Sequence, residues 1–202
     1  MDYGHIYQAV EFYRERGYVY VEDAPWHVGR DAYYATKPLG AVDVVLEAFR
    51  GDSPNDLPFD RPYMAASGEQ SFIQMMLDGQ PLKRAVCVTP CFRWEPRVDM
   101  LHRRYFMKAE LINAHDVDAG HLMHMVHEAC AFFEEFLPSV RIVRTPAGYD
   151  IVEKVTRVEL GSYGIREMVV GGTRLQWIYG TGCAEPRLST VVQRQLRDAD
   201  QL

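Results

Sequence analysis

One segment of the sequence gathers the residue types that recognise a nucleotide. Its pattern predicts two strands joined by about six to eight residues, which is a hairpin. Because side chains alternate along a strand, Arg93 and Glu95 share one face, and so do Phe106, Lys108 and Glu110. Such a face offers a guanidinium for a phosphate, a ring for a base and carboxylates for amino groups. A surface hairpin with cross-strand ion pairs is the other interpretation of the same pattern.

A second segment, Gly180–Leu188, joins a predicted strand to a predicted helix through a glycine-containing turn. Backbone at such a turn can approach a ligand closely, and the N-terminus of the following helix favours anions. The third glycine of a dinucleotide-binding fingerprint is missing. Taken alone, the segment therefore fits a simple strand-to-helix connection.

The elements that would position these segments are helices and consecutive runs of strands. Helices are expected over residues 6–16, 69–77, 118–137 and from 186 to about 196. Strands are expected over residues 18–21, 85–92, 105–112, 140–144, 151–160, 167–170 and 175–179. Turns are expected at Gly161, Gly164 and Gly171–Gly172, a loop over 50–62, and residues 31–48 are ambiguous. We expect an α+β fold, an antiparallel β-sheet flanked by helices, in a single domain over residues 1–202.

Composition and charge exclude several classes of protein. Apolar residues make up 48% and charged residues 25%, which is ordinary for a globular chain. The apolar runs are too short for a membrane span, and the first residues lack a secretory signal. Four cysteines without such a signal are typical of reduced thiols, so we expect a cytoplasmic protein without membrane association. A net charge of −6 disfavours an RNA-binding module that works through a basic patch.

Together, the two segments resemble motifs 2 and 3 of a class II aminoacyl-tRNA synthetase/biotin ligase-like catalytic core. The residues that fit motif 2 are Phe92, Arg93, Glu95, His102, Phe106 and Glu110. The residues that fit motif 3 are Gly180, Gly182 and Arg187. Residues 17–25 look like motif 1, and residues 67–69 and 158–162 look like two further segments of the family. These landmarks follow the family order and cover nearly the whole chain.

The resemblance implies ATP-dependent activation of an amino acid, or a related carboxylate, as its adenylate. Pyrophosphate would be released, and the acyl group would then pass to an acceptor. Arg93 would bind the α-phosphate and Arg187 the γ-phosphate, and these arginines would be the catalytic residues. Phe106 and Arg187 would sandwich the adenine. Glu95 would meet the adenine amino group, and His102 would touch the phosphate tail. The other implied ATP-binding residues are Gly180, Gly182, Glu159 and Ser162.

The same resemblance implies a substrate pocket and a metal ion. Glu69 would pair with the ammonium group of the amino acid. The other implied substrate-binding residues are Ser67, Lys108 and Glu110. Glu159 and Ser162 would hold Mg²⁺, which prefers a carboxylate together with phosphate oxygens.

No zinc is expected. The three histidines at positions 121, 124 and 127 fan around their predicted helix instead of facing one ion. Related cores with a substrate-binding zinc carry a cysteine where this chain has Gly68. The cofactors that the resemblance implies are therefore ATP and Mg²⁺ alone.

Two departures from the family pattern leave an alternative function open. Ala184 replaces the third glycine of motif 3, and Pro186 replaces the acid that precedes its arginine. These changes favour a non-catalytic synthetase paralogue that acts as a regulatory or binding subunit. The chain has room for a minimal core only, so the acceptor stays open among a carrier protein, a protein side chain, a small amine and a tRNA. Motif 1 supplies the dimer interface in this family, so we expect a homodimer formed through residues 4–26.

Overall fold

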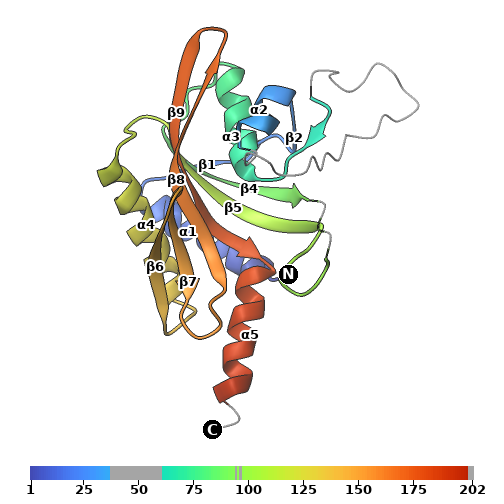
Figure 1. The fold of residues 1–202 in the computed structure, drawn as a ribbon, viewed down its shortest axis with the longest axis vertical. Helices are drawn as coiled ribbons and strands as arrows, with labels where there is room; N and C mark the ends of the chain where they lie inside the picture. Colours follow the sequence, from blue (N-terminus) through green and yellow to red (C-terminus); the bar gives the residue numbers. More distant parts are fainter. Residues whose placement is uncertain (37–60, 94, 96, 200–202) are drawn as a thin grey trace, which may run out of the picture.

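The structure is a computed structural model that describes residues 1–36, 61–93, 95 and 97–199 (Figure 1). Most of the predicted loop over residues 50–62 and of the ambiguous stretch over 31–48 lies outside the described residues. The beginning of the ambiguous stretch belongs to a helix, α2 (Arg30–Ala35). Within the described part of the chain, no helix is long and apolar enough to cross a membrane.

A seven-stranded sheet forms the centre of the molecule (Figure 1). Its strands lie side by side in the order β1 (Val19–Val21), β4 (Arg84–Phe92), β5 (Tyr105–Asn113), β9 (Thr173–Glu185), β8 (Glu159–Val170), β7 (Gly148–Glu153) and β6 (Val140–Thr145). All neighbours are antiparallel except β1 and β4, which run parallel at one edge. The predicted antiparallel sheet is confirmed, with one parallel pair added. A separate two-stranded ladder of β2 (His27–Val28) and β3 (Tyr63–Met64) was not predicted.

Helices pack on both faces of the sheet (Figure 1). On one face, α1 (Tyr3–Glu15) and α4 (Ala119–Glu134) enclose an apolar core with residues such as Tyr13 and Phe132. On the other face, α3 (Gly68–Leu77) and α2 enclose a second core that includes Phe72 and Trp177. The last helix, α5 (Arg187–Ala199), follows directly after β9. The α+β architecture that the sequence predicts is therefore confirmed.

Local sequence signals explain where these helices begin and end. The Asp118 side chain accepts a hydrogen bond from the backbone N–H of His121 at 2.8 Å, so it caps α4 as predicted. Asp2 caps α1 in the same way, through the N–H of Gly4 at 2.8 Å. Gly17 follows α1 with a φ of +85°, a left-handed conformation that favours glycine after a helix. The four predicted helices all form, with ends displaced by at most a few residues.

The predicted strand over residues 151–160 is wrong, because it is interrupted. Strand β7 ends at Glu153, and residues 154–158 turn before β8 begins. The Glu153 carboxylate holds this turn, since it accepts the backbone N–H of Val155 at 2.9 Å and the Thr156 hydroxyl at 2.6 Å. The turn predicted at Gly171–Gly172 is confirmed, because both glycines have positive φ between β8 and β9.

The predictions of turns at Gly161, Gly164 and between Gly180 and Gly182 are wrong. All four glycines lie inside β8 or β9. They permit close contact instead of chain reversal. A Cβ atom on Gly180 would lie 2.6 Å from a ring carbon of Tyr163 and 2.7 Å from the sulfur of Met125. The glycines are needed because large side chains press directly on these strands.

Replacing Gly180 by alanine should therefore overpack the core between β9 and α4. We expect Gly180→Ala to lower the free energy of unfolding by about 1–3 kcal/mol, because the new methyl group must displace Tyr163 and Met125. Urea denaturation followed by circular dichroism measures this loss. The matched control is Gly120→Ala in the exposed first turn of α4, where a Cβ would meet only the flexible Asp118 side chain, at 3.2 Å, and stability should change by no more than about 1 kcal/mol. Equal stability of the Gly180→Ala variant and the wild type would contradict the close-contact interpretation.

Candidate active site

Residues from the two predicted nucleotide-binding segments meet around one pocket. It holds about 340 Å³ of empty space, partly open to solvent. Its lining residues are Arg93, Glu95, Leu101, His102, Arg103, Phe106, Ala184, Glu185, Pro186 and Arg187. The family resemblance assigned five of them to ATP: Arg93, Glu95, His102, Phe106 and Arg187. The antiparallel pairing of β5 with β9 brings the two segments together.

Arg93 stands at the end of β4 with its guanidinium held from two sides. Its Nε donates to the carbonyl of Ala66 at 2.9 Å, and its guanidinium carbon lies 5.0 Å from the centre of the Phe106 ring. Its backbone N–H donates to the Arg104 carbonyl at 3.0 Å, which extends the hairpin ladder by one step. Among the residues that the structure describes, Arg93 forms no ion pair. A guanidinium fixed in this way is prepared for an anion.

The hairpin connection is longer than predicted and contains a residue that sequence reasoning missed. It spans residues 93–104 instead of six to eight residues. One Asp99 oxygen accepts the backbone N–H groups of Leu101 and His102, each at 2.8 Å, and lies 2.9 Å from Nδ1 of His102. The hydrogen bond from the His102 N–H, followed by that from Leu101, lowers the pKa of Asp99 to about 2. An aspartate three residues before a histidine in a polar loop was the available signal for this turn.

Arg187 lies in the first turn of α5 and reaches back to the start of β8. It donates to the Glu159 carbonyl at 3.2 Å and lies 3.3 Å from the Glu159 carboxylate. Glu185 fixes the first turn of α5. Its carboxylate accepts hydrogen bonds from the backbone N–H of Ser189 at 3.1 Å and from the Ser189 hydroxyl at 2.6 Å. Glu185, which also lines the pocket, contacts His5 at 2.7 Å. Sequence reasoning missed this capping role.

The residues proposed for Mg²⁺, Glu159 and Ser162, both lie near the start of β8. Glu159 keeps half of its side chain exposed, and Ser162 pairs in register with Asp150 of β7. Burial raises the pKa of Asp150, while a hydrogen bond from Ser162 opposes this increase. A carboxylate, a hydroxyl and a second carboxylate are hard oxygen donors of the kind that Mg²⁺ accepts beside phosphate oxygens. The donor set therefore fits Mg²⁺, and Asp150 is an addition to the predicted pair.

Gly180 and Gly182, both predicted to bind ATP, lie inside β9, and neither lines the candidate pocket. The ladder skips Gly182, because Glu110 of β5 pairs with Thr181 while Ala109 pairs with Cys183. Two buried tyrosines hold this bulge from the opposite face of the sheet. Tyr13 donates to the Gly182 carbonyl at 3.1 Å, and Tyr163 donates to the Thr181 carbonyl at 2.6 Å. Burial raises the pKa of both phenols well above the usual value, so they remain protonated donors.

Ser67, Lys108 and Glu110 form one hydrogen-bonded group on the face of the sheet that α3 covers. The Ser67 hydroxyl donates to Glu110 at 2.6 Å, and the Lys108 ammonium lies 2.8 Å from the same carboxylate. Glu110 is only 1% exposed. The structure thus brings together three of the four residues that the resemblance assigned to the substrate.

Glu69, the fourth residue, is engaged by groups of the chain itself. It lies in the first turn of α3 and is 4% exposed. Its carboxylate accepts the indole N–H of Trp177 at 2.7 Å and forms an ion pair with Arg166 of β8. Burial raises the pKa of Glu69, and Arg166 opposes that effect. The Arg166 guanidinium also lies 4.0 Å from the centre of the Tyr179 ring. Sequence reasoning missed Arg166, which lies far from Glu69 along the chain.

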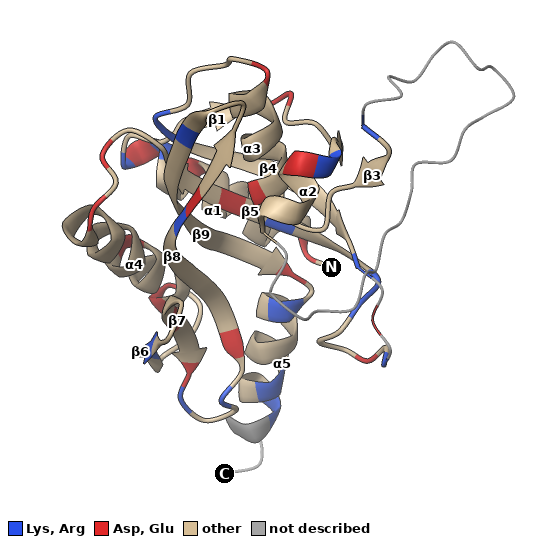
Figure 2. Ribbon diagram, turned by 45° about the horizontal axis from the view of Figure 1, so that its top comes forward, with Lys and Arg blue, Asp and Glu red and all other residues tan. Residues whose placement is uncertain are grey.

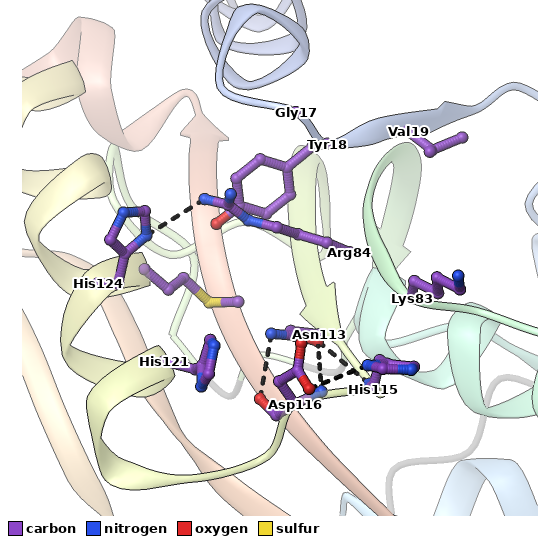
Figure 3. Close-up of a pocket in the computed structure, with 11 residues that line it drawn as sticks. Gly17, Tyr18, Val19, Lys83, Arg84, Asn113, His115, Asp116, His121 and His124 are labelled. Atoms are coloured by element: carbon purple, nitrogen blue, oxygen red, sulfur yellow. Dashed lines mark hydrogen bonds and ion pairs between the residues drawn. The ribbon is translucent and has the colours of Figure 1, made fainter.

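A larger pocket lies elsewhere, beside the turn between α1 and β1 (Figure 3). It holds about 1180 Å³ of empty space, much of it open to solvent. Several of its polar side chains already have partners: Arg84 pairs with Glu128, and the Asn113 carbonyl accepts the backbone N–H groups of His115 and Asp116. None of the predicted site residues lines it. The convergence of motif residues, and not size, places the candidate site in the smaller pocket.

The described residues include no group of three or more His, Cys, Asp or Glu side chains placed to hold a metal ion. The predicted histidine-bearing helix exists as α4. A cysteine at position 68 would place its Cβ 2.7 Å from that of Glu110, so the close packing of α3 on β5 opposes one there. The absence of zinc stays a prediction.

Comparison with known proteins finds similarity in structure but not in sequence. No protein-family model matches the chain, and no curated protein matches it in sequence. Among solved structures, it is similar to the cytoplasmic serine-tRNA ligase of Naegleria fowleri in complex with AMP, with a TM-score of 0.64 and 15% identity. The match covers 90% of this chain and 45% of that one, so the chain spans less than half the length of that ligase. At this identity the likeness shows the fold, which is that of a class II aminoacyl-tRNA synthetase catalytic domain.

The ion pair between Arg166 and Glu69 should contribute strongly to stability. We expect Arg166→Met to lower the free energy of unfolding at neutral pH by about 2–4 kcal/mol, somewhat less than for a fully enclosed pair. The reason is that Glu69 would remain buried without its cation. Because the pKa of Glu69 in the folded state is raised, the loss should shrink as the pH falls and the carboxyl becomes protonated. Urea denaturation between about pH 5 and 8 measures both effects.

The matched control is Arg174→Met on the same hairpin. Arg174 pairs with Glu167, but both side chains are more than half exposed. That variant should lose no more than about 1 kcal/mol, with little dependence on pH. If Arg166→Met and Arg174→Met lowered the free energy of unfolding equally, burial would not explain the contribution of the Glu69–Arg166 pair.

Proposed function

We propose that this chain activates an amino acid or related carboxylate as its adenylate, using ATP and releasing pyrophosphate. The acyl group then passes to an acceptor. The observation that carries this proposal is the single pocket in which Arg93, Glu95, His102, Phe106 and Arg187 converge. The class II synthetase fold supports it, as does the fact that the similar ligase is a complex with AMP.

The geometry supports a division of labour among these residues. Phe106 and the guanidinium of Arg187 provide two surfaces for an adenine ring. Arg93, held by the Ala66 carbonyl and the Phe106 ring, faces the same pocket, where it can neutralise charge on an α-phosphate. Basic residues occur both on α5 and on the segment between β4 and β5 (Figure 2), as a polyphosphate requires.

The reaction needs no nucleophilic side chain. The substrate carboxylate attacks the α-phosphorus, a new P–O bond forms, and the bond to pyrophosphate breaks. Glu159 and Ser162, with Asp150 beside them, would hold Mg²⁺, which neutralises phosphate charge when bound. The protein supplies position and fixed positive charge, which is the main requirement for phosphoryl and nucleotidyl transfer.

A non-catalytic paralogue, acting as a regulatory or binding subunit, is the second candidate. The specific observation in its favour is that Ala184 and Pro186 line the nucleotide pocket where the family carries a glycine and an acid. Arg187, which lines the same pocket, nevertheless contacts the Glu159 carboxylate, as expected if both residues serve the reaction. ATP–pyrophosphate exchange dependent on an added acid distinguishes an enzyme from a binding subunit.

Loss of Arg93 should abolish most of this activity. We expect Arg93→Ala to slow exchange by about 10²–10³-fold, because the guanidinium no longer stabilises charge on the reacting phosphate. Arg93→Lys should recover only part of the rate, since an ammonium lacks the two-pronged geometry. Exchange rates with labelled pyrophosphate, with folding checked by circular dichroism, measure both variants.

The control for this pair is Arg97→Ala in the same loop. Its side chain is 87% exposed, and it does not line the nucleotide pocket. Wild-type exchange in a folded Arg93→Ala variant would remove the assignment of Arg93 to the α-phosphate.

We also propose a cytoplasmic homodimer formed through residues 4–26. All four cysteines are free thiols. Strand β1 lies at an edge of the sheet, with Val19 64% exposed, and Tyr7 and Trp26 are more than half exposed. These residues offer an apolar surface to a second copy. Tyr18 does not contribute, because it is buried in the monomer's own core.

Sedimentation equilibrium at micromolar concentration tests the dimer. We expect twice the chain mass of 23.2 kDa for the wild type and a shift to monomer for Val19→Asp, since a carboxylate would be desolvated at the interface. Val155→Asp is the control, because Val155 is equally exposed but lies in the turn between β7 and β8. A monomeric wild type would refute the dimer.

A further inference from the structure

The carboxylate expected to read a substrate ammonium is already neutralised. Glu69 binds Arg166 through one oxygen and the Trp177 indole through the other. Both partners are fixed in turn. Trp177 is fully buried, and the Arg166 guanidinium rests on the ring of Tyr179. The ion pair between Glu69 and Arg166 therefore belongs to the packing of α3 against the sheet.

We call the surroundings of Ser67, Glu69, Lys108 and Glu110 the substrate region. Its second carboxylate, that of Glu110, has partners as well. Glu110 is contacted by the Lys108 ammonium and the Ser67 hydroxyl. The Lys108 side chain is 12% exposed and the Glu110 side chain is 1% exposed, so both members of this ion pair are largely buried. Each acid in this region is therefore matched by one cation from the chain.

The remaining acids of the site lie outside this group of residues. Glu159 contacts Arg187, and Asp150 is hydrogen-bonded to Ser162. Glu185 contacts His5, and Glu95 lines the pocket that holds Arg93 and Arg187. Within the described residues, the substrate region thus has no carboxylate without a partner. Both carboxylates are almost fully buried, with 4% of Glu69 and 1% of Glu110 exposed. A substrate ammonium that reached one of them would lose its water and lie beside Arg166 or Lys108, which adds like-charge repulsion.

We propose that the acid activated by this chain carries no ammonium group next to its carboxylate, being an acyl acid, a hydroxy acid or an N-acylated amino acid. This inference rests on the proposed adenylation and narrows its substrate class. The step balances without the ammonium: a carboxylate oxygen forms a bond to the α-phosphorus, and pyrophosphate leaves with the electron pair of the broken bond. Glu69 and Glu110 then act as positioning residues for Arg166 and Lys108.

Matched pairs of adenylate analogues test the proposal. Each pair is an aminoacyl-sulfamoyl adenosine and the analogue made from the same acid without its amino group, prepared for each proteinogenic side chain. Isothermal titration calorimetry with the full chain gives both affinities. In the best-binding pair, the analogue without the ammonium should bind at least about tenfold more tightly, as expected for an ammonium that loses its water without gaining a free carboxylate.

Variants of the Glu69–Arg166 ion pair test whether that pair causes the preference for the analogue without the ammonium. Arg166→Met frees the Glu69 carboxylate, so the preference should move at least about tenfold toward the aminoacyl analogue. The double variant Arg166→Met/Glu69→Gln has neither charge, so it should keep the wild-type preference. It also retains an acceptor for the Trp177 indole. Arg174→Met, which opens only an exposed pair, should bind both analogues as the wild type does.

The outcomes separate this inference from the proposed function. Tighter binding of the aminoacyl analogue to the wild-type chain overturns the inference and leaves adenylation standing. Binding of no analogue from any pair overturns the proposed function itself. An unchanged preference in a folded Arg166→Met variant would also overturn the inference, and if that variant does not fold, the wild-type comparison decides.

Discussion

The candidate site depends on the pairing of β5 with β9. This ladder brings Phe106, Lys108 and Glu110 beside the strand that leads into Arg187, although the segments are far apart in the sequence. The bulge at Gly182 changes the register within the ladder, so Thr181 lies opposite Glu110 and Ala184 opposite Lys108. This pairing therefore places the two segments that resemble motifs 2 and 3 side by side.

The face of the sheet that α1 and α4 cover stabilises the irregular backbone of β9. Two buried hydroxyls, from Tyr13 of α1 and Tyr163 of β8, donate to the carbonyls at the bulge. A carbonyl left without a partner in that core would cost about 1–3 kcal/mol, so these phenols fix the backbone irregularity in one arrangement. The other face, which α2 and α3 cover, has an apolar core of its own beside the buried acids Glu69 and Glu110.

Sequence patterns predicted the elements better than the contacts between them. Alternation identified β4 and β5, and Asp118 and Gly17 marked helix ends, because these signals are local. The glycines of β8 and β9 were misassigned to turns, since a glycine that permits close contact looks the same in sequence as one that permits a positive φ. Arg166 lies 97 residues from Glu69, so no spacing could connect them. Only the fold reveals that Glu69 already has a cation.

Charge compensation keeps arginines available in an acidic chain. The whole chain carries −6, yet Arg93, Arg103 and Arg187 line the candidate pocket, together with Glu95 and Glu185. The two buried acids nearby, Glu69 and Glu110, do not cancel these arginines, because Arg166 and Lys108 neutralise them locally. In a region of low dielectric, a paired acid has a weaker field at a distance than a free one. The same pairing leaves each of these two buried carboxylates with a cation from its own chain.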